Sequence, residues 1–127
     1  MTALFDAIGK AFQLIPEDKE NVLVNIFTDG LENDSKEFTE EIIKSLIKEK
    51  QNQGWIITFL GTSLEAMNQA SSIGISESDY FPYADTKEGT SVAFNLMSSA
   101  RDKYSKSIQD NTPLEDIFDK KKNQEID

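Results

Sequence analysis

The 127-residue chain contains no cysteine and no histidine. Their absence excludes disulfides, thiolate and imidazole metal sites, and nucleophiles activated by a histidine. Any metal ion would have to be bound by oxygen ligands alone. Such ligands are preferred by Mg²⁺, Mn²⁺ and Ca²⁺, so these are the cations to consider.

The sequence also lacks a long apolar run and an excess of basic charge. No run approaches the roughly 20 apolar residues that span a bilayer, and the first ten residues, with Asp6 among them, do not resemble a secretory signal. Acidic residues outnumber basic ones by 23 to 13, for a net charge of −10. This charge opposes binding to nucleic acids and to anionic membranes. We therefore expect a cytoplasmic protein that binds cations or proteins with basic surfaces.

Two apolar periodicities alternate along the chain. Apolar residues three and four positions apart predict helices over 3–14, 36–51, 62–73 and 87–108. Short β-branched and aromatic runs predict buried strands over 22–27 and 55–60, and the run 80–83, which contains a proline, predicts an edge strand. Capping boxes beginning at Asp34 and Thr62 are expected to start the second and third helices.

This alternation predicts an α/β fold, a Rossmann-like three-layer sandwich with a mostly parallel sheet of about three strands flanked by helices. The domain is expected to cover residues 1–109, and the charged stretch 110–127 has too few apolar groups to offset its ordering entropy, which predicts a mostly disordered tail. No strand precedes Val22–Phe27 to pair with its other edge. We therefore expect self-association through this edge, or its completion by a separate N-terminal segment.

The sequence Phe27-Thr28-Asp29-Gly30 follows a predicted buried strand. Ligands of open α/β sheets bind at the carboxyl ends of the strands, and a carboxylate there can hold a hard cation. The alternative is that Asp29 and Gly30 simply form the turn that leaves the strand.

Together with Thr2-Ala3-Leu4-Phe5-Asp6-Ala7-Ile8 and the strand within Gly54–Thr62, this motif resembles the von Willebrand factor type A family, in particular its small cytoplasmic bacterial and phage members. The resemblance extends from about Thr2 to Tyr104. It implies that Thr2 and Asp29 are the second and third elements of a metal-ion-dependent adhesion site, in which the partner protein supplies a carboxylate to the cation.

The first element of that site, an Asp-x-Ser-x-Ser run, is not present in this sequence. The chain thus resembles the C-terminal part of the domain, and Thr2 and Asp29 alone should bind Mg²⁺, Mn²⁺ or Ca²⁺ weakly or not at all, because the missing residues supply most of the oxygen ligands. Thr2 could equally act as a plain helix N-cap. The expected function is a non-catalytic protein-interaction domain with an incomplete adhesion site.

Acidic residues gather just after this motif. Gly30, Glu32 and Asp34 are candidate binding residues of a rim that could recruit a basic protein, although a solvated helix start also explains the charges. The alternative function is a phosphotransfer or phosphatase-like enzyme using Asp29 as nucleophile. Phe27 occupies the place where such phosphatases need another aspartate, and no glycine-rich phosphate loop is present. We therefore expect no enzymatic activity.

Overall fold

The computed structural model describes residues 3–28 and 31–111. In chain order, the helices and strands are α1 (Leu4–Leu14), β1 (Leu23–Phe27), α2 (Glu40–Asn52), β2 (Ile56–Gly61), α3 (Leu64–Ser72), a 3₁₀ turn (Glu77–Asp79), β3 (Tyr80–Pro82) and α4 (Lys87–Asp110). The predicted α/β fold is confirmed.

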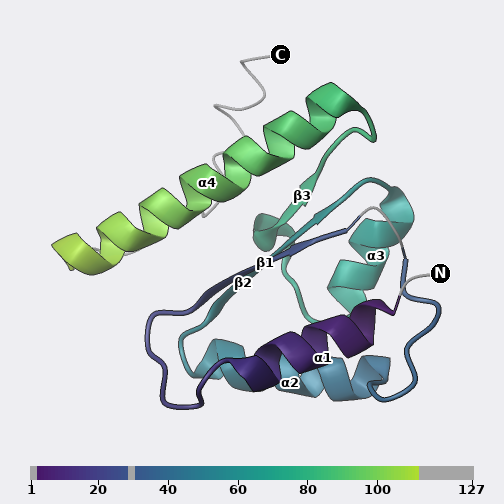
Figure 1. Cartoon of the computed structure of the whole chain (residues 1–127), viewed down its shortest axis with the longest axis horizontal. Coiled ribbons are helices and arrows are strands. Elements are labelled where there is room, and N and C mark those ends of the chain that lie inside the picture. Colours follow the sequence, from purple (N-terminus) through teal and green to yellow (C-terminus); the bar gives the residue numbers. More distant parts are fainter. Residues whose placement is uncertain (1–2, 29–30, 112–127) are drawn as a thin grey trace.

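The three strands form one parallel sheet in the order β1-β2-β3 (Figure 1). The register pairs Leu23 with Ile56 and Phe27 with Leu60, and it pairs Phe59 with Tyr80. β2 is the central strand, so β1 and β3 each have one neighbour among the described residues. β3 is an edge strand as predicted, and its proline stands at its end.

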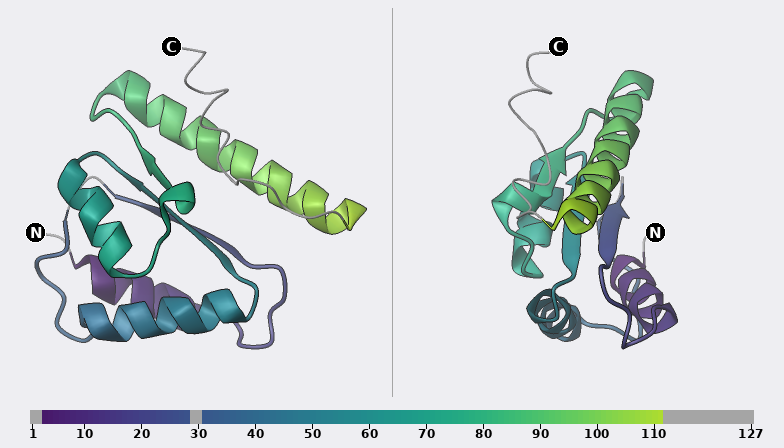
Figure 2. Two further views of the ribbon diagram at one scale, coloured as in Figure 1. Left: turned by 180° about the vertical axis from the view of Figure 1, so that it is seen from behind. Right: turned by 90° about the vertical axis from the view of Figure 1, so that its left-hand side faces the viewer.

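Three helices pack on one face of the sheet and a single helix packs on the other (Figure 2). Ile26, Ile57 and Phe59 point toward α1, α2 and α3 and form the larger core cluster. Leu60 points to the opposite face, where it packs with the α4 residues Ala93 and Leu96. Within the described ranges, three helices therefore cover one face of the sheet, whereas only α4 covers the other.

The start of α2 differs from the expectation. The helix begins at Glu40, and Thr39 is its N-cap, accepting the Ile42 amide at 3.2 Å. The predicted cap at Asp34 is wrong. Because residues 36–38 give their amides to the Asp6 carboxylate instead, the chain does not enter the helix until residue 40. Similarly, α3 is capped by Ser63 and not by Thr62.

Three apolar residues at helical spacing, which the periodicity of 36–51 and 62–73 predicts to face inward, are exposed. Ile42, Leu64 and Met67 are 44%, 65% and 37% exposed, because the contacting stripes of α2 and α3 are narrower than the periodicity implied. In β1 only Ile26 is buried, with 6% of its surface exposed, although burial of the strand on both faces was expected. This partial burial follows from the position of β1 at an edge of the sheet.

The last helix continues through Asp110, one residue beyond the expected domain end, and Asn111 caps it in the left-handed conformation with φ 53°. The remaining residues of the predicted tail lie outside the described part of the chain. Among the described helices, none has both the length and the apolar composition needed to cross a bilayer.

Candidate functional site at the carboxyl end of the sheet

The predicted site lies where β1 ends. After the strand, the Thr28 amide still donates to the Leu60 carbonyl at 3.2 Å, which extends the ladder by one residue. Thr2, Asp29 and Gly30 lie outside the described residues, so their assignment as ligands stays a prediction. Their neighbours Ala3 and Thr28 are described, and α1 begins beside the end of β1 (Figure 1).

Glu32 joins the loop after β1 to the first turn of α1. One of its carboxylate oxygens, Oε1, accepts the Phe5 amide at 2.9 Å, and the other, Oε2, accepts the Ser35 amide at 3.0 Å. The Ser35 hydroxyl also donates to Oε1. Burial opposes ionisation of this carboxyl, but the Ser35 hydroxyl and these backbone amides outweigh burial and lower the pKa of Glu32.

Asp6 makes the reciprocal connection from α1 to the loop. Its Oδ2 accepts the Lys36 amide at 2.8 Å, and its Oδ1 accepts the amides of Glu37 and Phe38 at 3.0 and 2.8 Å. The Lys36 bond is the largest influence on the pKa of Asp6, and the three amides together lower it against the opposing effect of burial. Two carboxylates thus hold the loop, Glu32 near its start and Asp6 near its end, and both accept backbone amides in their ionised form.

This geometry bears on the expected acidic rim. The Glu32 oxygens are occupied by donors within the chain, and its own amide donates to the Gln69 side chain in α3 at 3.0 Å. Asp34 is half-buried. In the ranges 3–28 and 31–111, no group of three or more acidic residues is arranged to hold a metal ion. Asp6 and Glu32 therefore order the loop, whereas the expected cation ligands Thr2 and Asp29 lie outside the described ranges.

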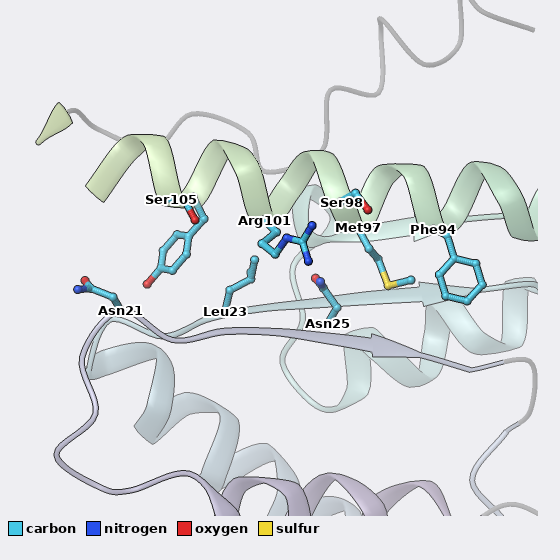
Figure 3. A pocket seen from close by; sticks show the side chains of 9 residues that line it. Asn21, Leu23, Asn25, Phe94, Met97, Ser98, Arg101 and Ser105 are labelled. Carbon is cyan, nitrogen blue, oxygen red and sulfur yellow. The ribbon is translucent and has the colours of Figure 1, made fainter. Parts of the chain in front are cut away.

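A second candidate region, which the sequence analysis did not anticipate, is a groove between β1 and α4 (Figure 3). Its cavity volume is about 360 Å³. The residues lining it are Asn21, Leu23, Asn25, Phe94, Met97, Ser98, Arg101, Tyr104 and Ser105. Its only sequence signal is the polar Asn25 within an otherwise apolar strand; this side chain accepts the hydroxyl of the fully buried Thr58 at 2.5 Å.

Comparison of the chain with protein-family models, with curated proteins and with solved structures finds no match. The resemblance to von Willebrand factor type A domains therefore rests on the sequence motifs alone.

Proposed function

We propose that this protein is a non-catalytic, cytoplasmic protein-interaction module of the von Willebrand factor type A kind, with an incomplete metal-ion-dependent adhesion site. The proposal is supported above all by the bond from the Phe5 amide to Glu32. This bond holds the start of α1 next to the loop that follows β1. Those are the two segments that contain Thr2 and the Asp29-Gly30 pair, so the contact brings together the chain neighbours of both proposed ligands.

The proposed chemistry is recognition completed by a cation. Thr2 offers a hydroxyl and Asp29 a carboxylate, which suits Mg²⁺, Mn²⁺ or Ca²⁺. Two protein ligands leave most of an octahedral shell to water, so the cation is bound weakly and a carboxylate from the partner strengthens its binding. Gly30 allows close approach of the partner at this edge, while Asp34 supplies negative charge that favours a basic partner surface. Glu32 contributes its charge only at a distance, because its oxygens accept the Phe5 and Ser35 donors.

Calorimetric titration of the full chain with Mg²⁺ tests this proposal, together with Mn²⁺-induced broadening of NMR signals. We expect a dissociation constant weaker than about 1 mM and selective broadening of the Ala3 and Thr28 amides. Both effects should be lost in Asp29→Asn and kept in the matched control Asp18→Asn, which changes an exposed residue between α1 and β1.

Three results would contradict the proposal. Micromolar affinity that depends on Thr2 and Asp29 would mean that the adhesion site is complete. Uniform broadening that Asp29→Asn does not reduce would mean that the cation does not bind at this end of the sheet. Turnover of p-nitrophenyl phosphate that Asp29→Asn abolishes would favour the phosphatase-like alternative.

A further inference from the structure

The edge of β1 that faces away from β2 carries backbone hydrogen-bonding groups that pair with no other strand in residues 3–28 and 31–111. The Ile56 amide donates to the Val22 carbonyl and the Thr28 amide to the Leu60 carbonyl. In a parallel ladder, every second residue directs both its amide and its carbonyl toward the same neighbour. It follows that the even-numbered residues of β1 pair with β2. The backbone groups of the odd-numbered residues point outward: Leu23, Asn25 and Phe27.

The side chains of these same odd-numbered residues face α4 and line or adjoin the groove. Phe94 is 54% exposed and stacks on Phe27 with ring centroids 5.1 Å apart. Arg101 is exposed between Phe94 and Tyr104 on the groove wall, and it forms no salt bridge with any residue in the described ranges. The groove thus offers apolar surface at both ends, a cation between them, and strand-pairing groups along its floor.

We propose that residues 114–119 of this chain, Leu-Glu-Asp-Ile-Phe-Asp, occupy the groove as a fourth parallel strand paired with β1. The direction of α4 supports this occupant. Phe94 stacks on Phe27 at the end of β1. At the other end of the groove, Ser105 lies on the side of Asn21, which precedes the start of β1 (Figure 3). Helix α4 therefore runs antiparallel to β1 and ends on the side where a parallel strand must begin.

The helix terminus also suits a chain reversal. Asn111 has the left-handed conformation that commonly terminates helices, and Pro113 follows two residues later, where a proline prevents the helix from continuing. Residues after this point can turn back toward the groove. A return of about 9 Å brings the chain from Asn111 to the level of Ser105, since a helix rises 1.5 Å per residue. Three extended residues, 112–114, span about 10 Å, which covers this distance along the helix axis.

The topology is consistent with the handedness of the existing crossovers. Two of them, through α2 and α3, advance from β1 toward β3 with their helices on the same face of the sheet. A crossover from β3 through α4 to a strand beyond β1 would run across the sheet in the opposite direction. Helix α4 also lies on the opposite face of the sheet from α2 and α3. Reversing both the direction and the face leaves the handedness of a crossover unchanged, so this connection has the same handedness as the other two. The product is a four-stranded, doubly wound sheet.

The side chains of the segment match the groove in spacing and chemistry. A strand from Leu114 to Phe118 spans about 13 Å, close to the roughly 15 Å that separate Phe94 from Tyr104 along α4. Strand alternation places Leu114, Asp116 and Phe118 toward α4, with Asp116 at the level of Arg101. Residues 112–119 contain three acidic residues and no basic one, so the pairing is attractive although the whole chain is negative.

This occupant fits better than a second copy of the chain. Two copies joined along β1 would each carry a net charge of −10 and would repel one another. In such a dimer the strand next to Arg101 would be the β1 strand of the other copy, which contains no acidic residue. The inference is separate from the proposed cation site, because the groove lies along the side edge of the sheet and shares no described residue with the loop 31–39.

Amide hydrogen exchange of the full chain, measured by NMR at two protein concentrations, tests the proposal. We expect the Leu23, Asn25 and Phe27 amides to exchange at least tenfold more slowly than amides of an unpaired strand edge would. This protection should not depend on protein concentration. Asp116→Lys should accelerate exchange at Asn25 about tenfold. The matched control Glu115→Lys makes the same charge change on the opposite face and should leave this rate unchanged. Adding Arg101→Glu to Asp116→Lys should restore protection.

Protection of the Thr58 and Leu60 amides, which face β1 from the central strand, reports in every variant that the fold is intact. The proposal is overturned if the three edge amides are unprotected in the wild-type chain, or if Glu115→Lys and Asp116→Lys have equal effects. It is also overturned if protection grows with protein concentration, which would identify a second copy as the occupant.

Discussion

The Asp6 carboxylate accepts the amide of Phe38 at 2.8 Å, across 32 residues of the chain. An acidic side chain in the first turn of α1 thus fixes the loop that leads into α2. The same contact sets the position of the Phe38 side chain, which is half-buried, packs against the core and lies next to Gly9 of α1. The two helices are therefore connected by backbone geometry as well as by apolar packing.

A substitution at Gly9 tests how closely this loop approaches α1. An added Cβ would lie 2.4 Å from Cε1 of Phe38, so the ring would have to move. Replacing a helical glycine with alanine ordinarily stabilises a helix by about 1 kcal/mol. Here we expect Gly9→Ala to lower the free energy of unfolding by about 1–2 kcal/mol, because overpacking outweighs that gain. Urea unfolding curves measure the difference.

The sign should reverse when the ring is absent. In a Phe38→Ala background, the same Gly9→Ala change should raise the free energy of unfolding by about 0.5–1 kcal/mol. A loss of similar size in both backgrounds would mean that Phe38 is not the obstacle.

Neutralising Glu32 should destabilise the fold. Glu32→Gln keeps one acceptor oxygen but places an amide donor against the Ser35 or Phe5 donors that the carboxylate now accepts. Hydrogen bonds to charged groups contribute about 1.5–3 kcal/mol each, and partial exposure reduces this, so we expect a loss of about 1–2 kcal/mol. Thermal and urea unfolding measure it, with the exposed Glu17→Gln as the control. If Glu32→Gln did not change the free energy of unfolding, Glu32 would not be needed to hold the loop, and its role in binding a basic protein would remain open.

The two clamping carboxylates also predict a pH dependence. Hydrogen bonds lower the pKa of both Asp6 and Glu32 from ordinary values of 3.8 and 4.5. A carboxyl whose pKa is lower in the folded state stabilises the fold above its unfolded pKa and loses that contribution as the pH falls toward its folded pKa. Stability should therefore decline as the pH drops below about 4.5. The double variant Asp6→Asn/Glu32→Gln should decline less steeply over the same range in melting experiments.

The order and type of the helices and strands could be predicted from the sequence because each depends on local apolar spacing. The stripe of α4 illustrates this. Its apolar spacing predicts one inward side formed by Ala93, Leu96, Met97, Ala100 and Tyr104, of which the first, second and fourth are buried and the other two half-buried. The start of α2 could not be predicted in the same way. Asp34 and Glu37 fit a local capping box, but the acceptor that orders these residues is Asp6, which belongs to another helix.

The candidate sites show the same division. The strand end before Asp29 was predictable from composition, because the carboxyl end of a buried parallel strand is defined by the strand itself. The groove was not, because it needs residues near 21–25 and 94–105 to be brought together by the antiparallel packing of α4 on β1. The sequence left Glu32 either in a rim that recruits a basic protein or at a solvated helix start, and only the folded geometry reveals that its oxygens face the amides of Phe5 and Ser35.

The charge of Lys50, which lies against Trp55, affects the free energy of unfolding in two opposing ways. The Lys50 ammonium lies 4.9 Å from the centroid of the Trp55 ring, and the residue is only 9% exposed. Burial disfavours the charge, whereas the ring face and the C-terminal end of α2 favour it, by about 1 kcal/mol and 0.3–1 kcal/mol respectively. Because the ammonium stands at a helix end with some access to water, we expect the favourable terms to dominate.

Lys50→Met keeps the alkyl stem and removes the charge, so it isolates these terms. We expect it to lower the free energy of unfolding by about 1 kcal/mol, whereas Lys50→Arg should cost less because a guanidinium also stacks on indole. The exposed Lys48→Met serves as the control for loss of charge from α2. Urea unfolding followed by the fluorescence of Trp55, the single tryptophan of the sequence, measures all three variants. If Lys50→Met were more stable than the wild type, the cost of burying the ammonium would exceed its attraction to the ring and the helix end.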